Sequence, residues 1–432
     1  SWLKVVHVWC NASAVYASTP AWRPDVLLPP SSLPPLPMTL EGNTTHSFYV
    51  TYTPAASVQP GTYTSSFCLQ QGALCVGVSV EVWGVKLPPL EASFPTLFNL
   101  FYTRDDDGAT DLAEYYGGTL SPTMKAAYFD ALCAAGIPPD NMYVETPRAW
   151  ADIEALAACG APMFGILDVS RAATGDVPLN YTSAQLGAVV SILAPVVSNL
   201  TRAGLLSRAY VYGFDEVHTA YVPAMRQMFS AVKAAYPALT TVAAVRWTPP
   251  TDLDLDVWVN LYSLWDPDTA EAWASSRPGR KAFAYHCISP RPNPPGGPTT
   301  FLNTFLEDPW MDARLLPWFA AQQGAQGWLY YLVDGWSFGN QHQVVTLLPG
   351  STSKTNFSAV RYNNKAVPGD PGAFTNGDGI LIYPGPSGPL LSARLANFRD
   401  GLHDVALLHN LNRTAIAEVT AGVLHYTRDV GV

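Results

Sequence analysis

From residue 94 onward the chain alternates short apolar runs with helix-like segments, and this alternation is the strongest constraint on its fold. The apolar runs are rich in β-branched and aromatic residues, which favour buried strands, while the segments between them have helical periodicity. Eight strands are predicted, at residues 97–102, 141–145, 163–168, 210–216, 241–247, 257–262, 281–287 and 327–333. Eight strand–helix units over about 250 residues are typical of a (β/α)8, or TIM, barrel.

The helices of this barrel are expected at residues 121–135, 149–158, 183–202, 222–236 and 315–323, with a closing helix at 391–408. Residues 1–90 have a different character, because period-two alternation surrounds a Pro60-Gly61 turn signal. A small β-sandwich is expected there. The predicted fold is therefore multidomain α/β, with an N-terminal β-sandwich (1–90), a (β/α)8 barrel (91–345) and a C-terminal extension (346–432).

The composition excludes several classes of protein. Hydrophobic residues make up 48% of the chain and charged residues 13%, which excludes a disordered chain. The net charge of -10 and the lack of a basic stripe argue against a nucleic-acid partner. No apolar run in the sequence approaches the ~20 residues of a transmembrane segment. Without a Cys-x-x-Cys motif or a His/Cys cluster, neither a metal site nor a cofactor is expected.

Sequons and cysteine spacing indicate the secretory pathway. Asn-x-Ser/Thr sequons begin at Asn11, Asn43, Asn180, Asn199, Asn356 and Asn412. Cys68 and Cys75 have the spacing of a short hairpin that a disulfide closes, Cys133 and Cys159 form a second candidate pair, and Cys10 and Cys287 have no assigned partner. We expect a secreted or extracellular protein, with the cell surface or matrix as alternatives. Because Ser1 opens into strand-like sequence, any signal peptide is expected to be removed or to lie outside the sequence.

Asp215 and Glu216 end the fourth predicted strand. Alone this dipeptide is better explained as a helix N-cap, but the catalytic groups of a parallel barrel lie at such strand ends. Successive residues point in different directions, so the two acids are not expected to flank one bond as an ordinary retaining pair does. Substrate-assisted hydrolysis fits better, with one acid protonating the leaving oxygen and the other orienting the substrate's own 2-acetamido group.

Further aromatic and polar residues fall at or near the other predicted strand ends. Aromatic rings can stack on sugar faces, although about half of these rings are expected to belong to the core. The candidates for substrate binding are Tyr102, Asp168, Arg246, Trp247, Tyr262, Tyr285, Tyr331, Asp334 and Trp336.

Several sequence blocks stand in a characteristic order along the chain, namely residues 60–63 with 82–88, 212–216, 314–318 with 327–331, and 377–404. Together they resemble glycoside hydrolase family 123 and related bacterial domains of unknown function. The resemblance implies a retaining β-N-acetylgalactosaminidase that acts through an oxazolinium intermediate. It assigns Asp215 to holding and polarising the acetamide and Glu216 to general acid/base catalysis. The chain departs from the family pattern at Tyr331, where Trp is common, and at Asp334, where Asn is common.

Two other hypotheses remain open. The same barrel and acid pair can serve a different sugar, because a fold does not fix its substrate. The second alternative is a non-catalytic glycan-binding or structural extracellular glycoprotein, which the many sequons and the altered Tyr331 and Asp334 favour. Retention of Asp215 and Glu216 argues against it. In every case the partner is a glycan or glycoconjugate, and the sequence does not define the oligomeric state.

Overall fold

The structure is a computed structural model of the 432-residue chain. It describes residues 2–13, 16–33, 40–55, 57–69, 74–84, 94–102, 112–116, 120–291, 301–336, 344–358, 376–408, 420–422 and 425–426.

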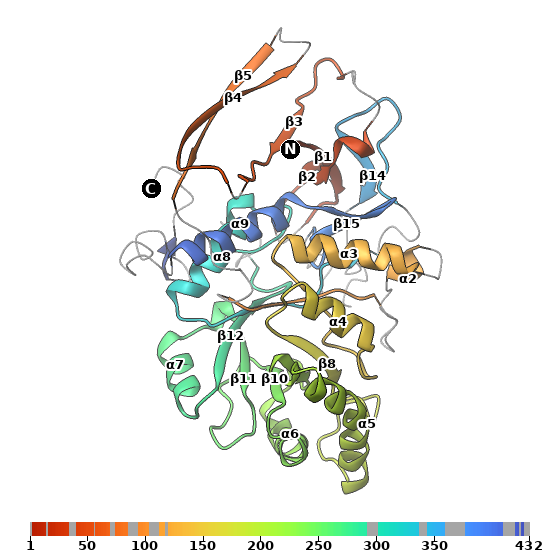
Figure 1. Ribbon diagram of the computed structural model, residues 1–432, viewed down its shortest axis with the longest axis vertical. Helices are drawn as coiled ribbons and strands as arrows, with labels where there is room; N and C mark the ends of the chain where they lie inside the picture. Colours follow the sequence, from red (N-terminus) through yellow and green to blue (C-terminus); the bar gives the residue numbers. More distant parts are fainter. Residues whose placement is uncertain are drawn as a thin grey trace.

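Eight parallel strands form the central sheet (Figure 1), in the order β7-β6-β13-β12-β11-β10-β9-β8. The strands are β6 (Thr96–Asn99), β7 (Pro139–Asp140), β8 (Phe164–Asp168), β9 (Ala209–Tyr212), β10 (Thr240–Ala244), β11 (Val257–Leu261), β12 (Lys281–His286) and β13 (Trp328–Tyr330). The predicted eight-stranded parallel sheet is thus confirmed, and its near-closed form fits a TIM-barrel fold. β7 is the shortest strand of this sheet and is displaced from its predicted position at 141–145.

The gap between β7 and β8 is bridged by hydrogen bonds outside the regular ladders. The Asp168 N–H donates to the Val144 carbonyl at 2.7 Å. The Asp140 carboxylate accepts from the Gly165 N–H at 3.0 Å and from the Tyr210 hydroxyl at 2.7 Å. A Cβ on Gly165 would lie 3.1 Å from the Tyr210 ring, so glycine lets this tyrosine reach Asp140 inside the barrel.

Helices cover the outside of the sheet (Figure 1). They are α3 (Pro122–Ala134), α4 (Trp150–Ala158), α5 (Ser183–Arg202), α6 (Val222–Ala235), α7 (Pro267–Ser275), α8 (Trp310–Gln322) and α9 (Ala393–Leu408), with the short α2 (Leu112–Tyr115) beside them. Helix α5 begins with a capping box between Thr182 and Gln185. By length and composition α5 could cross a membrane, but here it packs on the barrel through Val189, Leu193 and Leu200. Helix α7 was not predicted, although Asp266 as N-cap and Pro267 as the first helical residue are typical signals of a helix start.

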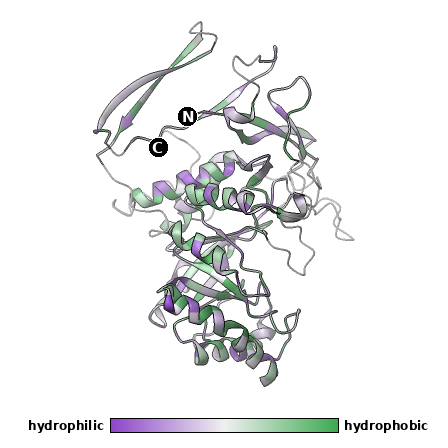
Figure 2. Cartoon of the chain, turned by 45° about the vertical axis from the view of Figure 1, so that its right-hand side comes forward, coloured by the Kyte–Doolittle hydropathy of each residue, from purple (hydrophilic) through white to green (hydrophobic). Residues whose placement is uncertain are grey.

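The N-terminal strands build one sheet and one separate hairpin. β1 (Trp2–Cys10) pairs with β2 (Ala21–Leu28), β3 (Ser47–Val50) and β14 (Lys354–Ser358). β4 (Gly61–Leu69) and β5 (Leu74–Val82) form a two-stranded hairpin that stands apart from the barrel (Figures 1 and 2). A two-sheet sandwich is not confirmed, because the described strands do not form a second sheet facing the first. The division of the chain near residues 90 and 345 stays a prediction, and β14 pairs across it with β1.

The expected Cys68–Cys75 pair forms a disulfide, and so does the second candidate pair, Cys133–Cys159, whose pairing the sequence left open. Cys68–Cys75 joins directly paired residues of β4 and β5, and Cys133–Cys159 joins α3 to the end of α4. Cys10 and Cys287 are free and buried.

The C-terminal part closes onto the barrel and the N-terminal sheet. It contains the hairpin β15 (Ile382–Gly385) with β16 (Gly388–Leu391), then α9, and the short strands β17 (Thr420–Gly422) and β18 (His425–Tyr426). Arg394 of α9 is fully buried and pairs with Asp25 of β2 at 2.8 Å. The same guanidinium donates to the Ile380 carbonyl at 2.5 Å. Because unpaired buried charges are costly, this pair fixes α9 against β2.

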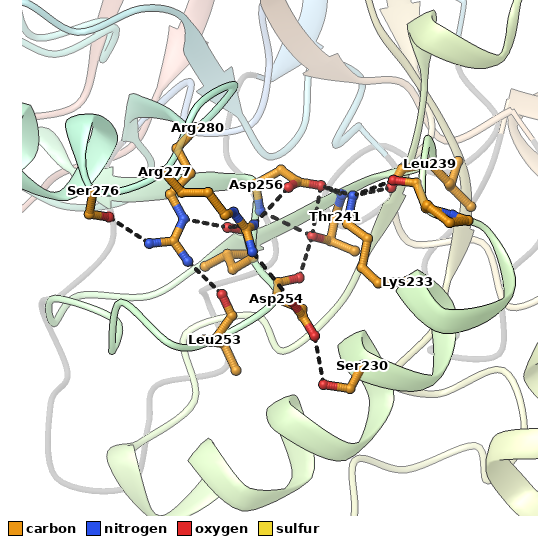
Figure 3. Close-up of polar contacts among 12 residues, drawn as sticks. Ser230, Lys233, Leu239, Thr241, Leu253, Asp254, Asp256, Ser276, Arg277 and Arg280 are labelled. Atoms are coloured by element: carbon orange, nitrogen blue, oxygen red, sulfur yellow. Dashed lines mark hydrogen bonds and ion pairs between the residues drawn. The ribbon is translucent and has the colours of Figure 1, made fainter.

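A polar network ties the N-terminal ends of β10 and β11 to α6 and to the segment after α7 (Figure 3). Asp256 accepts from Arg277 Nη2 at 2.8 Å and forms an ion pair with Lys233. Asp254 accepts from Ser230 Oγ at 2.7 Å and faces Arg277 Nη1 at 3.3 Å. This end of a barrel serves stability, since the catalytic groups lie at the other end.

We expect Asp256→Ala to lower the free energy of unfolding by about 2–4 kcal/mol, because two partly buried cations lose their shared carboxylate. Urea unfolding followed by circular dichroism measures this. The matched control is Asp252→Ala, which removes the exposed Arg226–Asp252 pair and is expected to cost about 1 kcal/mol or less. Equal losses in both variants would show that the network adds nothing beyond a surface ion pair.

Candidate active site

The chain leaves β9 through a strained turn that presents the two acids. Phe214 and Glu216 have φ angles of 62° and 47°, in the left-handed region that side chains other than glycine rarely adopt. A Cβ on Gly213 would lie 3.1 Å from the Ser170 Cβ, so only glycine fits there without a shift. The Glu216 N–H donates to the Ala244 carbonyl of β10 at 2.7 Å, which holds the turn. Such strain costs about 1–3 kcal/mol per residue and gathers at functional sites.

Asp215 points toward the barrel interior. Its Oδ1 accepts a hydrogen bond of 2.6 Å from the Tyr212 hydroxyl. Desolvation in the barrel mouth raises the pKa of Asp215 to about 6, partly opposed by the Tyr212 hydrogen bond, while Glu216 adds a further rise. The side chain is exposed toward the pocket, where water limits this rise. Desolvation and the neighbouring Glu216 thus hold the pKa of this carboxyl above its ordinary value.

Glu216 lies in a different environment from its neighbour. Arg246 donates to Oε1 through Nε at 3.0 Å and to Oε2 through Nη2 at 2.7 Å. The Tyr285 hydroxyl also donates to Oε1. About a third of the Glu216 side chain is exposed (36%), compared with 42% for Arg246. Two acids whose surroundings differ in this way are suited to different roles in one reaction.

The two acids share a small pocket at the C-terminal ends of the strands. Its volume is about 200 Å³, which suits one sugar ring rather than a large ligand. The lining residues are Tyr143, Asp215, Glu216, Ala244, Tyr285, Cys287, Ile288, Leu329 and Tyr331. Aromatic and aliphatic walls with carboxylates on one side can hold the apolar face and the hydroxyls of a sugar.

Five of the candidates for substrate binding lie in or near this pocket. Tyr285 and Tyr331 line it, and Arg246 contacts Glu216 from just outside the lining. Asp168 is buried at the end of β8, where it accepts from Ser170 Oγ at 2.6 Å. Desolvation raises the pKa of Asp168 to about 7, and the charge of Asp215 contributes. Trp247 donates from Nε1 to the Val217 carbonyl at 2.8 Å and so holds the chain after Glu216.

The structure places the other four candidates in the core and not in the pocket. The Tyr102 ring lies edge-on to Phe129 and 4.5 Å from the Lys125 ammonium. Tyr262 is fully buried and donates to the Leu302 carbonyl. Asp334 accepts from the Phe101 N–H at 3.1 Å, and Trp336 donates to the Ile382 carbonyl at 2.7 Å. Each lies near a predicted strand end, but the residues that it contacts here do not line the pocket.

Sequence reasoning missed several residues at the site. Tyr143 lines the pocket and packs edge-on against Tyr212, with ring centroids 5.5 Å apart. Asp378 accepts a hydrogen bond of 2.9 Å from the hydroxyl of Tyr331. Cys287 also lines the pocket. The sequence contained signals for these residues, because Tyr143 falls in the predicted second strand, Cys287 ends the seventh, and Asp378 lies in one of the family-like blocks.

The sequons differ in accessibility. Asn43, Asn180 and Asn356 are exposed, whereas Asn11 and Asn199 are half-buried. Asn11 accepts a hydrogen bond of 3.1 Å from Trp9 Nε1, and Asn412 lies outside the described residues. Among the residues that the structure describes, His, Cys, Asp and Glu form no cluster that could hold a metal ion.

The family model described as "Glycoside hydrolase 123, catalytic domain" matches residues 186–411. This range is just over half of the chain and includes both acids. The chain belongs to glycoside hydrolase family 123. The resemblance to family 123 seen in the sequence blocks is therefore confirmed. The acid pair lies in the barrel of a glycoside hydrolase.

One solved structure agrees with this assignment at the level of fold. A family 123 glycoside hydrolase from Clostridium perfringens aligns with a TM-score of 0.64 at 12% identity, over 97% of this chain and 79% of that chain. At this identity the likeness shows the fold alone. A family 5 mannosidase from Rhizomucor miehei aligns with a TM-score of only 0.36 at 9% identity, over 73% of this chain and 95% of that chain. Among curated proteins, no match is found for this family 123 member.

Proposed function

We propose that this family 123 member is a secreted, retaining β-N-acetylgalactosaminidase, or acts on a related β-linked N-acetylhexosamine, with the substrate's acetamido group as the nucleophile. The observation that supports this most is the unequal placement of the adjacent acids. Asp215 is held by Tyr212 inside the mouth of the barrel, while Glu216 lies at the more polar edge beside Arg246. A separate nucleophilic carboxylate opposite Glu216 is not needed, because the acetamido group of the substrate is the nucleophile.

The chemistry divides between the two acids. The ionised Asp215 accepts the acetamido N–H, and this polarises the acetamido carbonyl oxygen so that it attacks C1. Glu216 donates its proton to the glycosidic oxygen as the C1–O bond breaks, and the alcohol leaves. The resulting oxazolinium ring carries the positive charge, which the Asp215 carboxylate stabilises. Glu216 then takes a proton from water as that water attacks C1 and opens the ring, so the anomeric configuration is retained.

The pocket walls supply orientation for this reaction. Tyr285 and Tyr331 place hydroxyl groups at the pocket, and the Tyr331 hydroxyl is itself held by Asp378. Tyr143 presents a ring whose position is fixed by Tyr212. Rigid aromatic groups of this kind position a sugar with little loss of conformational entropy, which favours the reactive geometry.

Export from the cell is supported by two observations. The Cys68–Cys75 and Cys133–Cys159 disulfides are typical of proteins that mature in an oxidising compartment. Exposed sequons at Asn43, Asn180 and Asn356 are accessible to a glycosyltransferase.

The proposal predicts turnover of an aryl β-N-acetylgalactosaminide and release of the β-anomer as the first product, which proton NMR detects during the reaction. The matched aryl β-galactoside lacks the acetamido nucleophile and should react more slowly by a factor of at least about 10³, given the effective molarity of an internal nucleophile. Comparable turnover of both glycosides, or initial release of the α-anomer, would contradict the mechanism. No turnover of any glycoside, with glycan binding retained, would favour the non-catalytic alternative.

A further inference from the structure

Arg246 forms an ion pair with Glu216, the residue that acts as the acid in the proposed reaction. It holds Glu216 in a two-pronged pair, with contacts of 3.0 Å to Oε1 and 2.7 Å to Oε2, and Tyr285 also donates to Oε1. A guanidinium has five N–H donors and no acceptor, so the O–H of a protonated Glu216 would find no acceptor on Arg246. In this arrangement both oxygens of Glu216 are engaged by donors. The pair must therefore open before Glu216 can protonate a leaving group.

The position of Arg246 indicates what could open the pair. Arg246 follows β10 and is 42% exposed, whereas the residues lining the sugar pocket include Glu216 and Tyr285 but not Arg246. It contacts both of those lining residues from outside, with Nε 3.2 Å from the Tyr285 hydroxyl. A general acid lies beside the glycosidic oxygen, so a group just beyond it meets the part of the substrate that leaves.

We propose that Arg246 binds an anionic group, a carboxylate or a sulfate ester, on the leaving part of the substrate, and that this exchange releases Glu216. The inference rests on the proposed function and narrows its substrate class. A carboxylate or a sulfate ester presents two acceptor oxygens side by side, so either can replace the Glu216 carboxylate as a two-pronged partner for the guanidinium. A neutral leaving group offers no such partner, so opening the pair would leave Arg246 without a charged acceptor.

The preference must be local, because the chain as a whole carries a net charge of -10 and repels anions at long range. The anion is thus expected to bind by contact with Arg246 and not by general attraction.

The test compares three disaccharides in which β-linked N-acetylgalactosamine is joined to a neutral hexose, to a uronic acid, or to a sulfated hexose. We expect kcat/KM to be about 10- to 100-fold higher for at least one anionic substrate than for the neutral one, since a charge-assisted pair is exchanged and not lost. The two anionic arms distinguish a carboxylate from a sulfate ester. Equal values for all three substrates would overturn the inference while leaving the proposed function intact.

Variants separate recognition from general effects on the enzyme. Arg246→Met is expected to bring the anionic-to-neutral ratio of kcat/KM to about 1, and Arg246→Lys to an intermediate ratio, because lysine keeps the charge without the fork. The matched control is Arg226→Met on α6, whose side chain pairs with Asp252 at the surface and which should keep the wild-type ratio. The ratio cancels any change common to both substrates. A wild-type ratio in Arg246→Met contradicts the proposal.

A binding measurement keeps the inference testable if no disaccharide is hydrolysed, which is the outcome that would refute the proposed function. Calorimetry on Glu216→Gln, in which Arg246 is already released from its ion pair, gives Kd for the uronic-acid, sulfated and neutral disaccharides. We expect at least about 10-fold tighter binding of an anionic ligand, lost in the Glu216→Gln/Arg246→Met double variant. Equal affinities in Glu216→Gln would refute the role of Arg246.

Discussion

Glu216→Gln is expected to lower kcat/KM by a factor of about 10³–10⁴ for a β-N-acetylgalactosaminide with an alkyl or sugar leaving group. Such a leaving group departs poorly as an alkoxide, and glutamine cannot donate the proton. A 2,4-dinitrophenyl glycoside leaves without protonation, so its first step should be affected far less. The measurement is steady-state kinetics on both substrates with the wild-type and variant proteins.

The second step of the reaction provides an independent check. In the proposed mechanism Glu216 also removes a proton from the attacking water, so the oxazolinium intermediate should accumulate when the variant reacts with the activated substrate. Azide needs no general base and should restore turnover with a glycosyl azide as product. Thermal unfolding of Glu216→Gln should match the wild type closely, because the lost Arg246 pair is half-exposed. Equal losses with the alkyl and dinitrophenyl substrates would contradict the acid role.

The sequence predicts the barrel well because its signal is local and repeated. Each strand is a short apolar run, and the order of strands around the sheet follows the chain, so counting places Asp215 and Glu216 on the fourth strand. The N-terminal region lacks such a local and repeated signal. β14 pairs with β1 across more than three hundred residues, as His7 with Lys354, and no local pattern shows that pairing.

Side-chain direction is the part that the sequence does not determine. Tyr285 lies within β12 and points to the pocket, whereas Tyr262 begins a 3-10 turn after β11 and packs on Phe319 of α8. Both strands are apolar on both faces, so alternation gives no inward or outward phase. The same limit explains why Arg246 could be placed near the site from sequence, while its pairing with Glu216 could not.

Strain adds a further element that composition does not show. The left-handed backbone at Phe214 and Glu216 reorients two consecutive side chains that an ideal strand would send to opposite faces. Tyr212 then donates a hydrogen bond to Asp215, and Arg246 forms an ion pair with Glu216. The two acids therefore lie in separate environments although one peptide bond joins them, and this arrangement suits the proposed substrate-assisted mechanism.

Asp215→Asn should lower kcat/KM by about 10²–10³ for N-acetylgalactosaminides, because the amide keeps the size but removes the charge that stabilises the oxazolinium. The pH profile gives the sharper result. Since the pKa of Asp215 is raised to about 6, wild-type kcat/KM should rise with pH through that value as the carboxyl ionises. Asparagine does not titrate, so this acidic limb should disappear from the variant.

A further variant distinguishes Asp215 from its neighbour Asp168, whose pKa is raised to about 7. Asp168→Asn should retain the limb of the kcat/KM profile near pH 6. A limb lost in Asp168→Asn but kept in Asp215→Asn would assign the titration to Asp168 and contradict the proposed role.

The stability of the fold should change with pH in the opposite direction to the activity. A carboxyl whose folded pKa exceeds its unfolded value of about 4 favours folding below that value, and this contribution is lost as pH rises through about 6. Asp215→Asn should therefore gain thermal stability relative to wild type above about pH 6 and not below about pH 4, because ionisation then penalises only the wild-type fold.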